Sequence, residues 1–175
     1  MPIWLPLKSD PLVFDDALLL EFGRVLILWA KLEHALLSDI QQLIEIGERN
    51  GVTFAFKTKI QNAFSGRLDL WIKLSEDIYA NIPNMLTNAK EIYNGLKIIS
   101  KTRNVLIHGL LDGGKPLDDG SVRLATIQPA DQGKVMLAEY KINTHFLKIF
   151  GSDVTQFFDH IISMQVNRLL GTHRA

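Results

Sequence analysis

The sequence predicts a mainly α-helical protein, a four-helix bundle with a β-hairpin inserted between helices three and four. Apolar side chains recur every three or four positions over most of the 175 residues, which is the period of an amphipathic helix. Between about residues 121 and 142 apolar and polar residues alternate instead, on both sides of a run of turn-forming residues. A chain of this length holds one sizeable core but not two, so we expect a single domain over residues 15–170.

Composition places the chain among ordinary globular proteins and narrows its chemistry. It is 47% hydrophobic and carries 19 basic and 19 acidic side chains, so no overall charge favours nucleic acid or membranes. The sequence has no cysteine, which excludes disulfides and thiolate sites and fits a cytoplasmic location. The most apolar stretch, residues 18–37, contains charged side chains and therefore predicts a core helix, with no membrane span. The histidines lack metal-ligand spacing, so we predict no metal and no cofactor.

The first elements follow from prolines, capping residues and periodicity. Three prolines within residues 1–14 block a regular helix and predict an N-terminal arm. Asp15 is a typical N-cap, so the first helix is expected to begin there and to end near residue 46, stopped by Gly47. Its predicted buried face consists of large apolar residues at helical spacing: Phe22, Leu26, Trp29, Leu36, Ile40 and Leu43.

The next two helices are predicted over about residues 56–80 and 87–110. The second has an apolar stripe that includes Leu68 and Trp71, a basic exterior and one interior glycine, Gly66. Residues 112–120 are rich in glycine and aspartate and contain a proline, so they are expected to form a loop without packed structure.

The C-terminal third begins with the predicted hairpin at about residues 121–142. Asn143 or Thr144 is then expected to cap a last helix that runs to about residue 170. A glycine, a serine and an aspartate at residues 151–153 predict an interruption of this helix. Residues 171–175 are expected to be a frayed tail.

Three residues near the end of the third helix most need a functional explanation: Arg103, Asn104 and His108. Arg103 shares the apolar stripe of this helix, where an unpaired guanidinium would be very costly. Asn104 and His108 are four residues apart and therefore lie one above the other on a neighbouring face. Lys97 and Lys101 extend that row toward the N-terminus, and we expect them to contribute weakly to substrate binding.

Arg103 therefore requires a partner, and the first helix offers one. Glu33 lies one turn after Trp29, at the edge of the predicted buried face. Acidic residues outnumber basic ones in residues 1–50, and the reverse holds for residues 51–110. Complementary charges on neighbouring helices account for this asymmetry, and Glu33 is the predicted partner of Arg103.

The Arg-Asn-x-x-x-His arrangement resembles the signature of the HEPN superfamily (higher eukaryotes and prokaryotes nucleotide-binding). Its members are small helical domains in which four to six residues separate an arginine from a histidine, often with a polar residue after the arginine. Here four residues separate Arg103 from His108, and Asn104 occupies the polar position. Trp29 and Glu33 look like a pattern found on the first helix of several HEPN families. The hairpin departs from the minimal four-helix arrangement.

The resemblance implies a metal-independent endoribonuclease of the kind found in toxin and defence systems, with RNA as substrate. Arg103 would steady a phosphate, Asn104 would assist, and His108 would transfer a proton. Five positions at about 100° each place Arg103 and His108 roughly 140° apart on one helix. In the families that the chain resembles, two protomers pack together so that the motifs of both line one cleft. We therefore expect a homodimer whose motifs line a shared cleft. An antitoxin or a nucleotidyltransferase-like protein is the partner that the resemblance implies.

Two alternatives remain open at this point. In the first alternative, the chain is a non-catalytic bundle that binds a nucleotide, a nucleic acid or a partner protein, and the motif serves only a dimer interface. In the second alternative the motif is purely structural, because Arg103 pairs with Glu33 and His108 caps the helix end. A positively charged imidazole is favourable there, next to the last carbonyl groups of the helix.

Overall fold

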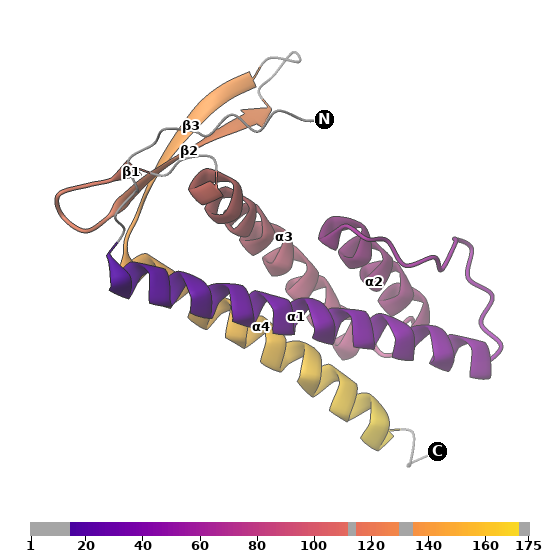
Figure 1. Ribbon diagram of the computed structural model, residues 1–175. Helices are drawn as coiled ribbons and strands as arrows, with labels where there is room; N and C mark the ends of the chain where they lie inside the picture. Colours follow the sequence, from indigo (N-terminus) through magenta and orange to yellow (C-terminus); the bar gives the residue numbers. More distant parts are fainter. Residues whose placement is uncertain (1–14, 112–114, 130–134, 172–175) are drawn as a thin grey trace, which may run out of the picture.

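The computed structural model describes residues 15–111, 115–129 and 135–171 (Figure 1). The predicted arm (1–14), most of the predicted tail (172–175) and residues 112–114 and 130–134 lie outside the described residues. The described part of the chain contains four helices and a small antiparallel sheet: α1 (Asp16–Arg49), α2 (Phe64–Ile78), α3 (Pro83–Leu111), β1 (Lys115–Pro116), β2 (Val122–Pro129), β3 (Val135–Ile142) and α4 (Thr144–Gly171). The prediction of a mainly helical chain with a hairpin between its third and fourth helices is confirmed.

α2 and α4 pack against α1, and α3 packs against α2, α4 and β2. Asp15 caps it as predicted, because its carboxylate accepts a hydrogen bond from the Ala17 N–H at 3.1 Å. The prediction that Gly47 ends the helix is wrong, since α1 continues to Arg49. Gly47 is instead a packing residue: the ring of Phe54 lies so close that an added Cβ would collide with it.

The predicted buried face of α1 is largely confirmed. Trp29, Leu36, Ile40 and Leu43 are buried and Phe22 is half-buried. Leu26 was expected to be buried but is 39% exposed, because the face is centred on Val25 and Leu32 instead. At that turn Val25, one residue earlier, takes the buried position, and the rest of the predicted stripe is unchanged.

The second helix is shorter than predicted, and its first third is replaced by an extended segment. Exposure alternates residue by residue from 52 to 60, which is the period of an extended chain. Phe54, Phe56 and Ile60 thereby pack against the core from outside a helix. α2 begins only at Phe64, so the basic residues of the 56–63 segment lie on this loop and not on a helix.

α3 begins at Pro83, four residues before the predicted start, because proline is favoured in the first helical turn. α4 begins after Asn143, whose side-chain oxygen accepts a hydrogen bond from the Phe146 N–H at 2.8 Å, as predicted for a cap. The predicted interruption at 151–153 is wrong, since α4 is continuous to Gly171. Gly151 is buried, with Val25 and Leu28 of α1 in van der Waals range of the place where its Cβ would be.

The sheet has the strand order β1-β2-β3, and β2 and β3 form the predicted hairpin. Their antiparallel register pairs Val122 with Ile142 and Pro129 with Val135. β1 corrects the prediction that residues 112–120 contain no packed structure, because Lys115 and Pro116 pair with β2. As the edge strand, β1 tolerates a proline, which cannot donate a ladder hydrogen bond.

The turn between β1 and β2 is fixed by Asp119 and Gly120. Gly120 has a φ of +75°, a value that favours glycine. The Asp119 carboxylate accepts hydrogen bonds from Lys141 Nζ at 2.6 Å and from both Ser121 N–H and Ser121 Oγ–H. These hydrogen bonds hold the pKa of Asp119 well below its usual range.

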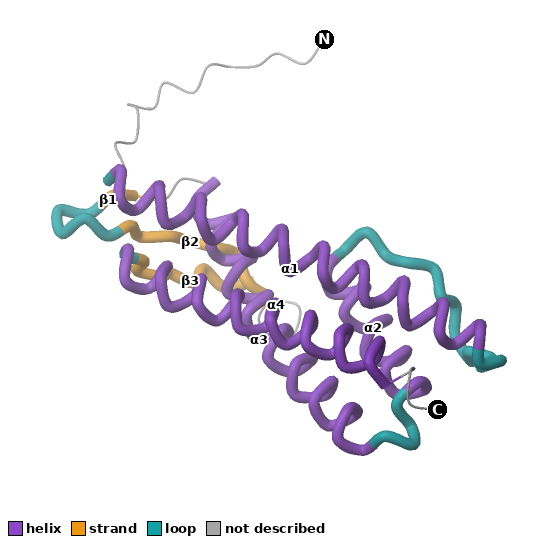
Figure 2. The backbone as a smooth tube through the Cα atoms, turned by 90° about the horizontal axis from the view of Figure 1, so that it is seen from below, coloured by secondary structure: helices purple, strands orange, loops and turns teal. Residues whose placement is uncertain are grey.

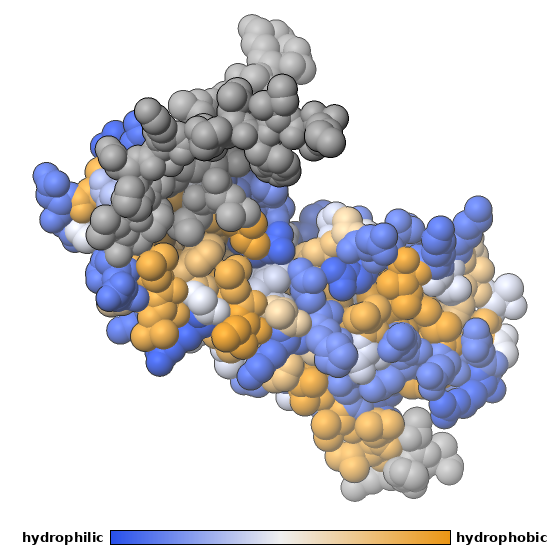
Figure 3. All heavy atoms as spheres, in the orientation of Figure 1, coloured by the Kyte–Doolittle hydropathy of each residue, from blue (hydrophilic) through white to orange (hydrophobic). Residues whose placement is uncertain are grey.

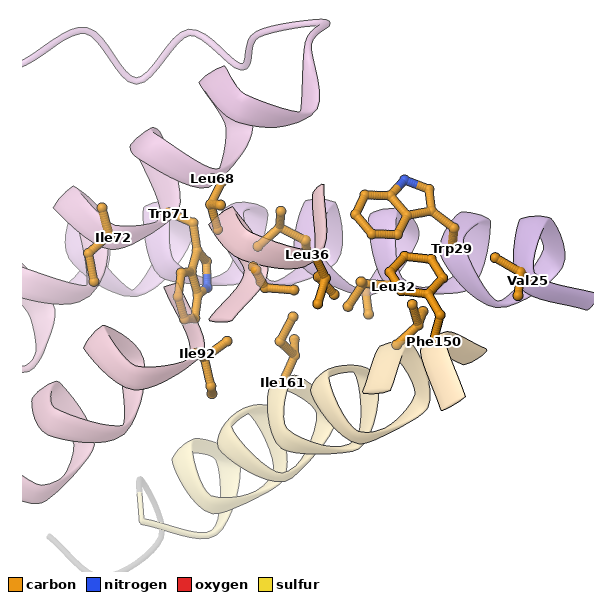
Figure 4. Packing of buried hydrophobic residues seen from close by; sticks show 14 of the residues in the cluster. Val25, Trp29, Leu32, Leu36, Leu68, Trp71, Ile72, Ile92, Phe150 and Ile161 are labelled. Atoms are coloured by element: carbon orange, nitrogen blue, oxygen red, sulfur yellow. The ribbon is translucent and has the colours of Figure 1, made fainter. Parts of the chain in front are cut away.

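One apolar core joins all four helices and the sheet. Side chains of α1, such as Leu32 and Leu36, lie between those of α2 and α4, as Figure 4 shows. α1 and α4 run side by side, and the sheet lies at the end of the molecule where both of them begin (Figures 1 and 2). Among the described residues no helix combines the length and apolarity needed to cross a membrane.

Large apolar side chains are also exposed, chiefly on α1 and α4. They include Leu20 and Ile27 on α1 and Leu169 and Leu170 on α4, each at least 55% exposed. Figure 3 shows apolar atoms mixed with polar ones over the described part of the face that it presents. On α3, Ile98 is the most exposed large apolar residue that the structure describes, at 68%.

Candidate functional site

A pocket of about 380 Å³ lies where α1, the N-terminus of α2 and the C-terminal half of α3 meet. Its volume lies within the range that small-ligand sites occupy. The lining is mostly polar and includes two arginines and one carboxylate: Trp29, Glu33, Asn62, Ala63, Phe64, Ser65, Arg67, Ser100, Arg103 and Asn104. Two of the three motif residues, Arg103 and Asn104, therefore face a cavity.

Arg103 is held in this pocket by few interactions. Its guanidinium lies over the ring of Trp29, 5.8 Å from the ring centroid, and Nη1 donates to Asn104 Oδ1 at 3.2 Å. Its Nε is buried and has no hydrogen-bond partner. A buried guanidinium N–H without an acceptor is costly and calls for an explanation.

The predicted ion pair between Glu33 and Arg103 is wrong. The Glu33 carboxylate pairs instead with Arg67 of α2, whose Nη2 lies 2.9 Å from Oε2. The indole N–H of Trp29 donates to the other oxygen at 2.6 Å. Both carboxylate oxygens of Glu33 therefore accept hydrogen bonds from residues other than Arg103. We call Trp29, Glu33 and Arg67 the pocket triad.

Arg67 resembles Arg103 in one respect that matters for binding. Its side chain is only 15% exposed, and its Nε is also buried without a hydrogen-bond partner. Only three buried side-chain nitrogen or oxygen atoms among the described residues lack a partner, and the third is Ser75 Oγ. Two of the three are thus guanidinium N–H groups of the same pocket.

A second cluster of the same composition lies inside the core, and it is closed. The indole N–H of Trp71 donates to Asp39 Oδ2 at 2.7 Å, and Arg168 Nη2 donates to Asp39 Oδ1 at 2.7 Å. Arg168 also donates from Nε to Tyr79 Oη at 2.7 Å and from Nη1 to Gln42. We call Trp71, Asp39 and Arg168 the core triad. Burial raises the pKa of the Tyr79 hydroxyl, and the nearby Asp39 carboxylate adds to that effect against the opposing charge of Arg168.

His108 is exposed and does not line the pocket in the described structure. It follows Asn104 by one helical turn on the same row, and Asn104 lines the pocket whereas His108 does not. The structure therefore brings Arg103 and Asn104 together and leaves His108 outside, as the angular separation along one helix predicts.

The two lysines of the row also lie outside the pocket. Lys97 is exposed, and its Nζ contacts Tyr93, 3.3 Å from Oη and 5.1 Å from the ring centroid. Lys101 is exposed and lines a different cavity of about 340 Å³ between α3 and residues of β3 and α4. Neither lysine lines the pocket that contains Arg103. Their predicted weak contribution to substrate binding would therefore be made outside the pocket, from the exposed surface of α3.

Sequence reasoning missed Arg67 and the N-terminus of α2. Because a continuous helix was expected over 56–80, Arg67 was counted as part of a basic exterior and not as a pocket residue. The start of α2 has no side-chain cap, since its N-cap is Ala63, and its first turn has no acidic residue. The unpaired first N–H groups of an α-helix attract anions. The polar residues before Phe64, including Asn62, were the available signal that the helix begins later than residue 56.

The chain matches no protein-family model, no curated protein and no solved structure. Within the described residues no three His, Asp or Glu side chains gather as metal ligands would. The residues of α3 and of this pocket therefore carry the functional interpretation.

Proposed function

We propose that this chain is a metal-independent endoribonuclease with a HEPN-like bundle, a toxin or defence component that works in the cytoplasm. The observation that supports this is the placement of Arg103. Its guanidinium, with an unpaired Nε, faces an open polar pocket beside Asn104, and exposed His108 follows one turn later. Arg103 offers a donor for phosphate oxygens in the pocket, and His108, outside the pocket on the same helix, is the candidate proton-transfer residue.

The proposed reaction is a transfer within the RNA strand. His108 removes the proton from a ribose 2′-hydroxyl, and the oxygen attacks the adjacent phosphorus. The bond from phosphorus to the 5′-oxygen of the next nucleotide breaks, and that oxygen leaves with the proton that the protonated His108 returns. The products are a 2′,3′-cyclic phosphate and a 5′-hydroxyl. Arg103 stabilises the charge on the non-bridging oxygens, and Asn104 orients the histidine or the phosphate.

The distance of His108 from the pocket supports a site shared by two protomers. In the proposed homodimer the α3 helices pack against each other, so that the motifs of both copies line one cleft. Ile98, the exposed apolar residue on α3, is available for such a contact. An antitoxin or nucleotidyltransferase-like protein would then control access to the cleft.

The first test is cleavage of a mixed-sequence single-stranded RNA in excess EDTA, with wild-type protein and His108→Ala. Loss of a general base lowers the rate about 10²- to 10⁴-fold, and we expect that loss in a folded variant. His145→Ala is the matched control, because His145 is equally exposed at the start of α4 and should retain full activity. Wild-type products should end in 2′,3′-cyclic phosphate.

Two outcomes would contradict the ribonuclease proposal. Cleavage that survives His108→Ala assigns the activity to another site or to a contaminant. Absence of cleavage by wild-type protein favours the second candidate: a bundle that binds a nucleotide, nucleic acid or partner protein without catalysis. The position of His108 outside the pocket is the observation that favours this candidate.

A further inference from the structure

We propose that Arg67 and Arg103 together form a binding site for a backbone phosphodiester of single-stranded RNA. This site is separate from His108, which lies outside the pocket, and it would anchor the strand. The identification of the ligand as RNA rests on the proposed function, whereas the preference for a phosphate follows from the pocket itself. Arg67 becomes a substrate-binding residue that comes from α2 and not from the motif.

The hydrogen-bonding state of the two arginines is the first support. Each has a buried Nε without a partner, and both side chains line the same cavity. Arg67 uses one N–H for Glu33, and Arg103 uses one for Asn104. A phosphate has several acceptor oxygens and can engage two guanidinium groups at once, so it could bind both arginines that line the cavity.

The start of α2 adds further donors to the same cavity. Ala63, Phe64 and Ser65 line it, and the helix lacks a side-chain cap there. The first backbone N–H groups of a helix are oriented toward its N-terminus and favour an anion. The hydroxyl groups of Ser65 and Ser100 lie on the same lining. The donors thus come from two helix faces and one helix end.

The charge of the pocket distinguishes between two kinds of phosphate. Two arginines and the carboxylate of Glu33 give the lining a net charge of +1. A phosphodiester carries a single negative charge, while the terminal phosphate of a free nucleotide carries nearly two at neutral pH. Glu33 would repel the second charge, so the lining is better matched to the RNA backbone than to a mononucleotide.

The experiment measures binding of a fluorescent 2′-O-methyl RNA oligonucleotide, which has no 2′-hydroxyl and cannot be cleaved. We expect Arg67→Gln to weaken binding about tenfold, the effect of losing a charge-assisted hydrogen bond. Arg67→Gln should also reduce the slope of log affinity against log salt by about one phosphate contact. Arg49→Gln is the control, because Arg49 is 74% exposed and pairs only with Glu45 on the far end of α1.

Glu33→Gln gives an effect of opposite sign. It removes the negative charge from the lining and frees Arg67, while the amide oxygen still accepts from Trp29. Binding should strengthen about threefold, as for the loss of a modest repulsion. A purely structural role of the triad predicts no gain. If Arg67→Gln does not fold, as judged by circular dichroism, Glu33→Gln alone decides.

The result overturning the phosphodiester site is unchanged affinity in folded Arg67→Gln, or no strengthening in Glu33→Gln. Tighter binding of AMP than of the oligonucleotide would also overturn it, in favour of a free nucleotide. Failure of the ribonuclease proposal is distinguishable. A wild-type protein that binds the oligonucleotide through Arg67 but cleaves no RNA retains the phosphate site and lacks the activity.

Discussion

The pocket triad and the core triad contain the same three groups and differ in how completely they are satisfied. In each, an indole N–H and an arginine donate to the two oxygens of one carboxylate on α1. In the core triad Asp39 is fully buried, and Arg168 donates from all three of its nitrogens. In the pocket triad Glu33 is 25% exposed, and the Nε of Arg67 has no partner.

This difference separates a structural role from a binding role. A buried polar cluster with every donor paired fixes the relative positions of the helices that contribute to it. The core triad draws its residues from α1, α2 and α4 and therefore joins three helices. The pocket triad joins only α1 and α2 and leaves Arg67 Nε unpaired beside a cavity. Under the proposed phosphate site, a ligand would supply acceptors for the arginines that line this cavity.

Removing the carboxylate of the core triad should have the largest effect on stability. Asp39→Ala leaves the Arg168 guanidinium buried and uncompensated, which costs about 3–5 kcal/mol of unfolding free energy. Urea denaturation followed by circular dichroism measures the loss. Glu45→Ala is the control: its ion pair with Arg49 is exposed, so a change below about 0.5 kcal/mol is expected. Equal effects of the two substitutions would contradict the role of the core triad.

Matched tryptophan substitutions in the two triads compare how much each indole hydrogen bond contributes to stability, with a smaller expected effect. Trp71→Phe and Trp29→Phe delete the same atoms from rings that are 0% and 3% exposed, so their packing losses are similar. Trp71→Phe also strips a donor from fully buried Asp39, at about 1–3 kcal/mol, whereas water replaces the donor at partly exposed Glu33. Urea denaturation should therefore show Trp71→Phe to be more destabilising by at least about 1 kcal/mol. Equal losses would mean that the two carboxylates have equivalent surroundings.

The sequence predicted those parts of the fold that local patterns determine. Helical periodicity, the Asp15 cap and the alternation in the hairpin each depend on neighbouring residues, and the structure confirms all three. Gly47 and Gly151 were misread for one reason. The sequence predicts both as breaks in a helix, whereas the ring of Phe54, from the segment that follows α1, packs against Gly47, and side chains of α1 pack against Gly151. Such a role depends on tertiary contacts that no local pattern contains.

The candidate site was also predictable only where a local pattern identifies its residues. Arg103 was recognised because a charge on an apolar stripe requires an explanation, and the structure does place it in a pocket. Its partner was misassigned, because the choice of Glu33 depended on which arginine lies nearer in space. Arg168 and Asp39 drew no attention in the sequence, since each is an ordinary charge near a helix end or face. Only the packing of α4 against α1 brings them together.

The smallest effect concerns the pH dependence of the core triad. Burial raises the pKa of Tyr79 above 10, so the folded protein retains a phenolic proton that the unfolded chain releases. Since the folded state then binds more protons, stability is fully present below pH 10 and is lost as the pH rises toward the raised pKa. Tyr79→Phe should flatten this decline in urea midpoints measured above pH 10, whereas Tyr93→Phe should preserve it, because Tyr93 bonds Asp69 at an exposed position. Identical slopes for wild type and Tyr79→Phe would mean that Tyr79 has the same pKa in the folded and unfolded chain, and that burial does not raise its pKa.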